Sequence, residues 1–427
     1  MILSIYHFLV ALFSNFLFGL PSRKIFIVGV TGTKGKSTVV ELINKILETA
    51  GKKTALLSSV REKVDRESKA NLYGNTMPGR WIIQKFIRGA VNAGCDYAII
   101  EVTSEGVRQF RHRFIDWDAA VFVNLAPEHI ESHGSFEKYR EVKASFFSSL
   151  SFSRKPKKYF FLNEEDPNFG YFEKAAEKVS NRKIIFFGRE KFVKDELSNH
   201  YNLSSKESRK LIGDWFLADF NLENAAAAAA FAKEQGISWP TIKTALDNFK
   251  GVPGRLEFIQ KNPFAVVIDY AHTTNSLKKV YETLEPTALS GQTAGEMICV
   301  LGAAGGGRDK WKRPIFGKIA AEHCDKVILT NEDPFDEDPN VILRQIEEGF
   351  LEAVKPRLKT ENYLQILNRR SAIRKAISLA RKGDVVIITG KGSEPYLRLA
   401  KGERVVWSER RTVEEALADL KRGSLEE

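Results

Sequence analysis

A glycine-rich segment near the N-terminus has the residue types of a phosphate-binding loop. The apolar run 25–28 leads into Gly29-Val30-Thr31-Gly32-Thr33-Lys34-Gly35-Lys36-Ser37, and a helical pattern follows from Thr38. A glycine-rich turn between a strand and a helix lets backbone N–H groups surround phosphate oxygens, and the helix N-terminus favours the anion. In such a loop the lysine reaches the β- and γ-phosphates, and the following serine hydroxyl holds Mg²⁺. We therefore expect these residues to bind a nucleoside triphosphate: Gly32, Thr33, Lys34, Gly35, Lys36, Ser37 and Thr38.

Further polar residues follow two predicted strands downstream of this loop. Glu101 lies near the end of the run 97–102, and Glu128 and His129 follow the next run, 119–123. Ligand sites of open parallel sheets gather where strands end, and Mg²⁺ prefers oxygen ligands, which Glu101 can supply. Residue type alone favours a structural role for His129. It likewise favours a solvated helix position for Lys143.

Apolar runs and helical patterns alternate along most of the chain, which is typical of βαβ units and a parallel sheet. The first group of expected strands is 25–30, 97–102, 119–123 and 159–162; the second is 265–269, 297–302, 326–330, 363–367 and 384–389. A polar, irregular stretch, 191–213, precedes an expected alanine-rich helix, 221–233. The turn Gly251-Val252-Pro253-Gly254-Arg255 separates the two groups. We expect an α/β fold with a central ATP-binding domain, 23–250, and a doubly wound, Rossmann-like C-terminal domain, 251–427.

The first 20 residues contain no Lys, Arg, Asp or Glu, and Arg23 and Lys24 follow them. This length of apolar chain is about what a membrane-spanning helix needs. The segment lacks the basic start and the cleavage site of a signal peptide. We expect a short apolar helix, 1–22, packed on the next domain or on a second subunit. Membrane association through residues 1–20, either flat or spanning, is the alternative.

The composition excludes several classes of protein. Hydrophobic residues make up 43% of the 427 positions and charged residues 28%, which excludes a disordered chain, a coiled coil and a polytopic membrane protein. The three cysteines, Cys95, Cys299 and Cys324, form no CxxC pair, so we expect neither a disulfide framework nor a cysteine zinc site. The net charge of +11 suits phosphates or an anionic membrane. The basic residues are scattered, so we expect no nucleic-acid binding.

The phosphate loop resembles that of the Mur ligase family, GxTGTNGK[ST], with Lys34 in place of Asn. Further similar motifs follow in the family's order across residues 23–410. Glu101 and His129 match the ligands of a second magnesium in segments similar to EVSS and NLxxDHLDxHG, although Glu105 stands where His is usual in the branch that adds the third stem residue. Lys143 matches the lysine that the family carbamylates, which places an anion beside Mg²⁺. The resemblance thus implies a metal site of Ser37, Glu101, His129 and carbamylated Lys143.

The resemblance also assigns residues to the nucleotide and to the amino acid. The segment Asp219 to Asn224 is similar to FNxxN, which implies that Asn221 and Asn224 contact adenine; Asn221 as an ordinary helix N-cap is the structural alternative. Similarity to GVPGRME and DYAHTP implies that Arg255 and Asp269 reach the nucleotide. Segments similar to TSDNPRxEDP and GKGHE imply that the amino acid is held by Glu332, Asp333, Phe335, Gly390 and Glu394.

The family membership would imply a cytoplasmic, ADP-forming ligase that uses ATP and Mg²⁺ to join an acid to an amino acid through an acyl phosphate, with Lys36, His129, Lys143 and Arg255 as catalytic residues. The motifs are most similar to the branch that adds the third residue to a UDP-N-acetylmuramoyl-dipeptide in peptidoglycan synthesis. Only about 22 residues precede the central domain, where that branch carries a domain that grips the UDP-sugar. A lipid-linked muropeptide or a polyglutamate-type or pseudomurein-type substrate is therefore the alternative, with the enzyme at the inner face of the membrane. A non-catalytic, membrane-attached ATP-binding protein is a further alternative.

The resemblance bears on the amino acid as well. Phe335 stands where the family has the arginine that reads the distal carboxylate of diaminopimelate, which argues against that amino acid. Glu332, Asp333 and Asp336 would instead favour a cationic side chain, such as lysine or ornithine.

Overall fold

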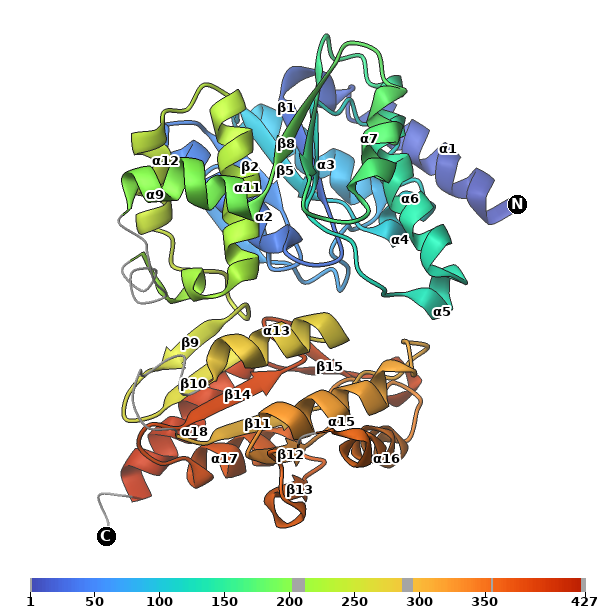
Figure 1. Cartoon of the computed structure of the whole chain (residues 1–427). Coiled ribbons are helices and arrows are strands. Elements are labelled where there is room, and N and C mark those ends of the chain that lie inside the picture. Colours follow the sequence, from blue (N-terminus) through green and yellow to red (C-terminus); the bar gives the residue numbers. More distant parts are fainter. Residues whose placement is uncertain (1, 202–211, 286–294, 355, 424–427) are drawn as a thin grey trace. The chain divides into compact units, whose positions relative to one another are not determined.

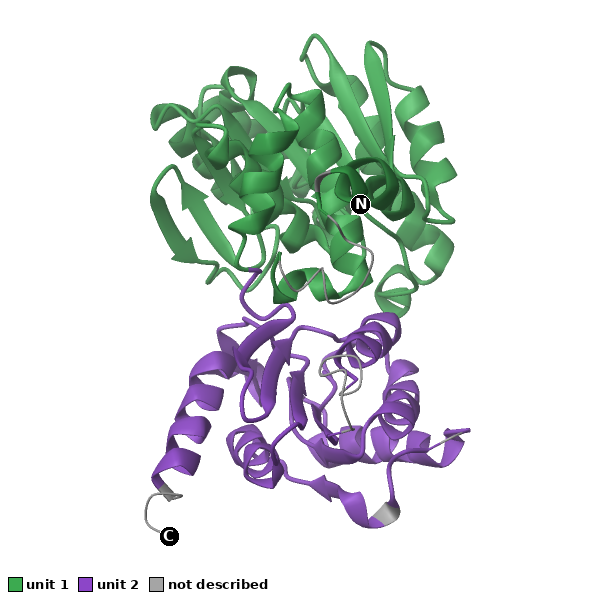
Figure 2. Ribbon diagram, turned by 60° about the vertical axis from the view of Figure 1, so that its left-hand side comes forward, with its two compact units in different colours: residues 1–250 green, residues 251–427 purple. Residues whose placement is uncertain are grey.

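The computed structural model describes residues 2–201, 212–285, 295–354 and 356–423. The chain forms two compact units, residues 1–250 and residues 251–427 (Figure 2). Each unit has its own sheet and its own core, and each is described below by itself.

Unit 1 is built on an eight-stranded sheet in the order β4-β3-β2-β5-β1-β6-β7-β8. Six neighbouring strands are parallel: β2, β5, β1, β6, β7 and β8. Strands β3 and β4 continue the sheet beyond β2 and are antiparallel. Strand β1 is central, so the loop that follows it emerges between the carboxyl ends of β5 and β6. The strands are β1 (Phe26–Thr31), β2 (Thr54–Leu57), β3 (Arg61–Val64), β4 (Glu67–Ala70), β5 (Tyr97–Glu101), β6 (Ala119–Phe122), β7 (Lys158–Asn163) and β8 (Arg182–Phe187).

Helices cover both faces of this sheet (Figure 1). Because side chains alternate along a strand, Ile27 and Phe122 face a core shared with α3, α6 and α7. On the other face, α2 packs against α11 and α12. The main helices are α1 (Ile2–Leu17), α2 (Lys36–Thr49), α3 (Arg80–Asn92), α4 (Ser104–Arg108), α5 (Ile130–His133), α6 (Phe136–Ser149), α7 (Phe169–Glu177), α11 (Asp219–Glu234) and α12 (Trp239–Asp247).

Unit 2 holds a six-stranded sheet in the order β13-β12-β11-β14-β10-β9, parallel except for β9. One face packs against α17 and α18 through a core that includes Ile268, Ile373 and Val413. Its elements are β9 (Glu257–Gln260), β10 (Ala265–Asp269), α13 (Thr274–Leu284), β11 (Met297–Leu301), α15 (Lys312–His323), β12 (Lys326–Leu329), α16 (Pro339–Glu348), β13 (Tyr363–Gln365), α17 (Arg369–Leu379), β14 (Val385–Thr389), β15 (Tyr396–Arg398), β16 (Arg404–Val406) and α18 (Glu409–Gly423).

The predicted α/β architecture with parallel sheets is confirmed, and every expected strand is present within a few residues. The strands β2, β3, β4, β8 and β9 were not expected: β4 has all four side chains exposed, and β2 has only four residues. Part of the stretch expected to be irregular is helical, at Phe192–Leu197 and Ser198–His200, and 202–211 lie outside the described residues. The apolar segment forms α1, which packs against α3. No helix in the described part of the chain is long and apolar enough to cross a membrane.

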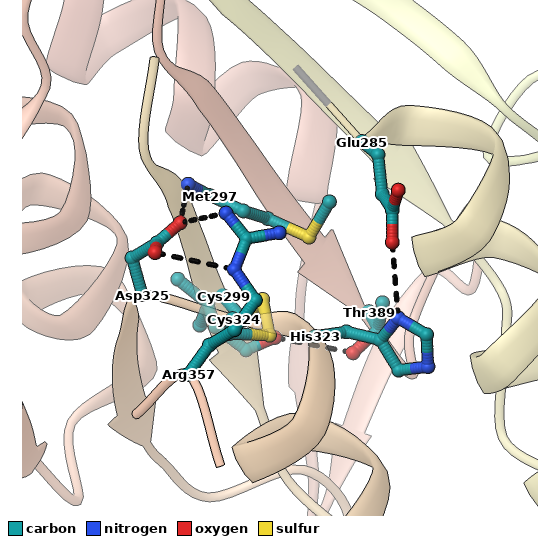
Figure 3. The surroundings of a disulfide bond; sticks show 9 residues. Glu285, Met297, Cys299, His323, Cys324, Asp325, Arg357 and Thr389 are labelled. Carbon is teal, nitrogen blue, oxygen red and sulfur yellow. Dashed lines mark hydrogen bonds and ion pairs between the residues drawn. A yellow bond between two sulfur atoms is a disulfide. The ribbon is translucent and has the colours of Figure 1, made fainter. Parts of the chain in front are cut away.

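The expectation of no disulfide is wrong, because Cys299 and Cys324 are bonded, with their Cα atoms 6.1 Å apart (Figure 3). Cys299 lies in the middle of β11, and Cys324 follows α15, the crossover helix that returns the chain to β12. Their 25-residue separation gives no hint of this contact, since the crossover alone brings them together. Beside the bond, Asp325 accepts hydrogen bonds from the Met297 N–H and the Arg357 guanidinium. Cys95 is a free, buried thiol.

Gly29 in the central strand provides a test of the unit 1 core. A Cβ at this position would overlap Phe146 Cζ and lie 3.0 Å from Trp117 Cζ3, so Gly29→Ala should lower the free energy of unfolding by about 1–3 kcal/mol. Gly89→Ala is the matched control, because Gly89 lies in α3 with no atom within 4 Å of the added Cβ, and it should be neutral or slightly stabilising. Chemical denaturation measures both variants, and equal effects would contradict the packing described here.

Candidate active site

The phosphate loop of unit 1 is fixed by hydrogen bonds from the neighbouring strand end. Thr33 N–H donates to the Asn124 carbonyl over 2.9 Å, and Lys34 N–H donates to Asn124 Oδ1 over 3.0 Å. Gly35, with φ of 81°, ends the loop, and α2 begins at Lys36. A Cβ on Gly35 would collide with Asn224 Oδ1. The loop therefore passes against α11 at a point where only glycine fits.

Two lysines converge on one carbonyl of this loop. Lys36 Nζ donates to the Gly32 carbonyl over 2.9 Å and to the Thr33 carbonyl over 3.1 Å. Lys143 Nζ, from α6, also donates to the Gly32 carbonyl over 2.9 Å. Burial lowers the pKa of Lys143 well below its usual value, and the charge of Lys36 lowers it further. Lys143 is therefore a buried amine with a strong tendency to be neutral, and not the solvated helix lysine that residue type alone favours.

Two of the predicted metal ligands, Ser37 and Glu101, are linked through Ser59. The Ser37 and Ser59 hydroxyl oxygens lie 2.8 Å apart, and the buried Glu101 carboxylate accepts the Ser59 N–H over 2.9 Å. Within the described ranges, no three His, Cys, Asp or Glu side chains lie close enough together to hold a metal ion. These oxygens suit a Mg²⁺ ion whose remaining ligands are phosphate and water.

His129 lies on the Tyr139 side of the loop. It has a φ of 57° and immediately precedes α5, and its ring centroid is 5.9 Å from that of Tyr139. The Tyr139 hydroxyl in turn lies 3.1 Å from Thr33 Oγ1. Among the predicted ligands, His129 is thus connected to the phosphate loop through an aromatic side chain.

Asn221 and Asn224 are buried in the first turns of α11. Asn224 Nδ2 donates to Asn221 Oδ1 over 2.9 Å, and Asn221 Nδ2 donates to the Trp215 carbonyl over 2.5 Å. The helix begins at Asp219, so Asn221 is inside it and does not serve as the N-cap. The pair instead holds the turn before α11 and directs Asn224 toward Gly35.

These unit 1 residues fit a nucleoside triphosphate with Mg²⁺. The glycine at position 35, the start of α2 and the ammonium of Lys36 form an anion-binding arrangement. Thr38, in the first turn of α2, is buried beside Ser37.

The predicted amino-acid residues of unit 2 surround a buried lysine. Lys391 Nζ donates to both oxygens of Asp333, over 2.8 and 2.9 Å, and to Glu394 Oε2 over 2.6 Å. Burial opposes the charged form, but Glu394 and Asp333 outweigh it and raise the pKa of Lys391. Lys391 was not among the predicted site residues, because the sequence pattern does not reveal where its side chain points.

Glu332 is packed against the backbone of Gly390, where a Cβ would collide with its carboxylate. Burial raises the pKa of Glu332 to about 7, although Arg369 opposes the shift. Arg369 donates to the Thr389 carbonyl over 2.7 Å and forms a buried ion pair with Glu409. This buried pair fixes the end of β14, from which Gly390 and Lys391 follow.

Phe335 and Asp336 lie at the rim of this cluster. Phe335 has a φ of 52°, and the Arg398 guanidinium carbon is 5.8 Å from its ring centroid. Asp336 accepts the Lys401 N–H over 2.7 Å, and Asp333 accepts the Arg398 N–H over 2.9 Å. Two of the carboxylates that suggested a cationic amino acid, Asp333 and Asp336, are thus already engaged within the unit.

Arg255 and Asp269 meet the same cluster through Tyr270. Asp269 Oδ2 accepts the Leu256 N–H over 2.7 Å, and the Arg255 guanidinium carbon lies 4.1 Å from the Tyr270 ring centroid. Tyr270 donates its hydroxyl hydrogen to Glu394 over 2.8 Å. Burial, followed by the charge of Glu394, raises the pKa of Tyr270 well above its usual value. Tyr270 was missed because an aromatic residue at a strand end usually indicates packing.

A second group that the sequence did not reveal lies beneath α1. Arg80 and Arg111 are partly desolvated and donate to the backbone carbonyls of Gln109 and Met77 respectively. Burial lowers the pKa of both guanidinium groups. Burial and these two arginines also lower the pKa of His7. The sequence does not indicate this group, because Arg80 and Arg111 are far apart in the chain and neither belongs to a recognisable motif.

Comparisons with known proteins identify the family. The Mur ligase middle domain matches residues 30–232, and the domain described as Mur ligase, glutamate ligase domain matches residues 254–392. The chain belongs to the Mur ligase family. Members of this family are ATP-dependent, ADP-forming ligases, and the predicted enzyme class is confirmed.

Individual Mur ligases are similar over most of the chain. The UDP-N-acetylmuramoyl-L-alanyl-D-glutamate–2,6-diaminopimelate ligase of Halalkalibacterium halodurans is 34% identical over 388 residues, which are 89% of this chain and 76% of that protein. The UDP-N-acetylmuramyl-tripeptide synthetase of Roseiflexus sp. is 35% identical over 428 residues, which cover 94% of this chain and 80% of that protein. A solved structure of a UDP-N-acetylmuramoyl-L-alanyl-D-glutamate–2,6-diaminopimelate ligase has a TM-score of 0.55 at 25% identity. The match covers 93% of this chain and 79% of the chain in that structure.

Gly35 allows a test of the loop in this Mur ligase. Gly35→Ala should weaken ATP binding at least about tenfold, because the added Cβ meets Asn224 and a left-handed conformation costs about 1–2 kcal/mol. The matched control is Gly51→Ala, at the other end of α2, which has a similar φ of 77° but no atom within 4 Å. Calorimetric titration with ATP and Mg²⁺ measures both variants. Equal affinities would show that the contact with Asn224 does not shape the loop.

Proposed function

We propose that this Mur ligase adds the third amino acid to a UDP-N-acetylmuramoyl-dipeptide in peptidoglycan synthesis, in the cytoplasm. The observation that carries the proposal is the phosphate loop on which Lys36 and Lys143 converge, in a chain that is 34–35% identical to enzymes named for the tripeptide step. The ammonium of Lys36 at the start of α2 suits a reaction in which charge on phosphate must be neutralised.

In the proposed reaction, a carboxylate oxygen of the acceptor attacks the γ-phosphorus of ATP, and the bond to the ADP oxygen breaks. The amino group then attacks the acyl phosphate, and inorganic phosphate leaves as the proton of the amine is lost. Lys36 exchanges the Gly32 and Thr33 carbonyls for phosphate oxygens. Bound Mg²⁺ would neutralise phosphate charge, with Ser37, Glu101 and His129 on its protein side. Most of the rate enhancement would come from positioning.

Lys143 has a distinct role in the proposal. A lowered pKa leaves its amine neutral, which is the form that reacts with CO₂ to give a carbamate. The amine nitrogen forms a bond to the carbon of CO₂ and loses a proton to solvent, so the neutral amine becomes an anion next to the ammonium of Lys36. The carbamate would then provide an oxygen ligand for the metal.

For unit 2, we propose that Asp333, Phe335, Gly390 and Glu394 receive the amino acid and that Glu332 supports Gly390 from behind. Phe335 provides no cation for a distal carboxylate, which argues against diaminopimelate. Lysine or ornithine remains the predicted class of amino acid, and its side-chain ammonium would compete with Lys391 for Glu394. Arg255 and Asp269 remain proposed nucleotide contacts, as the family resemblance implies.

The reaction is tested by supplying ATP, Mg²⁺ and UDP-N-acetylmuramoyl-dipeptide, or its lipid-linked equivalent, with each amino acid in turn. We expect ADP, phosphate and a product whose mass equals acceptor plus amino acid less water. Mass spectrometry identifies both substrates in one experiment. AMP and pyrophosphate would contradict the mechanism, diaminopimelate as the best amino acid would contradict the assignment of Phe335, and a polyglutamate acceptor would replace the proposed one.

Lys143→Ala should lower kcat about 100-fold or more, because it removes the group proposed to carry the carbamate. Added formate or acetate should restore part of the activity by supplying an anion in the space left by the side chain. Lys138→Ala is the matched control, since Lys138 is exposed on the same helix, and it should keep wild-type activity. With ¹³C-bicarbonate, a carbamate carbon signal should appear in wild type and be missing in Lys143→Ala. Full activity of Lys143→Ala without added acid would refute the role.

A further inference from the structure

The N-terminal helix α1 buries small and polar side chains against the protein and exposes large apolar ones. The side chains that face the protein include Ala11 and Ser14, which are almost fully buried, and Asn15, which is 8% exposed. The opposite stripe consists of large apolar side chains with exposed fractions between 55% and 64%: Tyr6, Leu9, Phe13, Phe16 and Leu17. A helix on a globular protein normally turns its apolar stripe inward. We call this outward stripe the α1 face.

Contacts with α3 hold α1 in this orientation. The Arg88 side chain donates to the Phe18 carbonyl, with a distance of 2.6 Å from Nε, and to the Gly19 carbonyl over 2.8 Å. The Trp81 and Phe18 ring centroids are 4.9 Å apart. Phe8 packs edge-on against Phe114. The exposed stripe is therefore not a consequence of a helix lying loose on the surface, and Figure 1 shows α1 along the outer side of unit 1.

Basic residues and an aromatic residue border the α1 face. Trp81 is 45% exposed on α3, and the exposed Lys85 lies one turn further along the same side of that helix. Lys24 is exposed just after α1, beside Arg23, which pairs with Asp116. No acidic residue precedes Glu41, and α3 contains three basic residues and no acidic one. An apolar stripe with a basic and tryptophan-containing border complements an anionic lipid surface.

We propose that the α1 face docks unit 1 in the plane of an anionic lipid bilayer. Phe13, Phe16 and Leu17 would enter the boundary between headgroups and acyl chains, and Lys24 and Lys85 would contact lipid phosphates. Because α3 holds the helix along one side, we expect α1 to lie along the surface of the bilayer. The inference depends on unit 1 alone and is independent of the ligase substrate.

Vesicle co-sedimentation of the full-length protein tests this inference. We expect binding to vesicles of phosphatidylcholine with phosphatidylglycerol, weaker binding to phosphatidylcholine alone, and loss of the difference at high salt. The double variant Phe13→Ser, Phe16→Ser should reduce the partition coefficient at least about tenfold, because each phenylalanine contributes a large apolar surface. Leu351→Ser, which removes a 92% exposed leucine from unit 2, is the control and should bind like wild type.

Two further measurements decide the outcome. ATP binding by the double variant should be unchanged, which shows that unit 1 has folded. Light scattering across a concentration series should show no dimer that depends on Phe13 and Phe16. Protein that stays in the supernatant with both kinds of vesicle overturns the proposal. A dimer that the double variant abolishes would also overturn it, by assigning the α1 face to a second copy of the chain.

Discussion

The Gly32 carbonyl is the point on which unit 1 is organised. It accepts hydrogen bonds from Lys36 on α2 and from Lys143 on α6, two helices that lie on opposite faces of the sheet. A second ammonium at this carbonyl would be buried and repelled by Lys36, and both effects lower the pKa of Lys143. Phosphate oxygens or a carbamate would relieve that repulsion. The position of β1 between β5 and β6 brings both lysines, Glu101 and the turn at Asn124 to one edge.

Unit 2 shows the converse arrangement of charge. The carboxylates of Asp333 and Glu394 bind one buried lysine, Lys391, and Arg369 with Glu409 forms a second buried pair. Removing one partner of such a pair leaves an uncompensated charge, at a typical cost of about 3–5 kcal/mol. The loop that begins at Gly390 is thus fixed by ionic contacts on both sides.

Much of this could be predicted from the sequence, for identifiable reasons. Central strands such as β1 and β10 are continuous apolar runs, and a phosphate loop is a local motif whose strand, glycines, lysine and helix occur in order. Edge strands such as β4, with all four side chains exposed, have no such pattern. Contacts that depend on crossovers also escaped prediction: the Cys299–Cys324 bond, Lys391 between two carboxylates, and Asn224 against Gly35. The helical spacing of His7, Ser14 and Asn15 indicates a partly polar side of α1, but it does not tell that this side faces the protein.

The central claim is that the loop after β1 binds the triphosphate and that phosphate oxygens replace carbonyls as the partners of Lys36. A crystal structure with a non-hydrolysable ATP analogue and Mg²⁺ tests it most directly. We predict that Lys36 Nζ leaves the Gly32 and Thr33 carbonyls for the β- and γ-phosphates, with Mg²⁺ beside Ser37. An analogue bound elsewhere on the protein, or bound while Lys36 keeps both carbonyl contacts, would contradict the account.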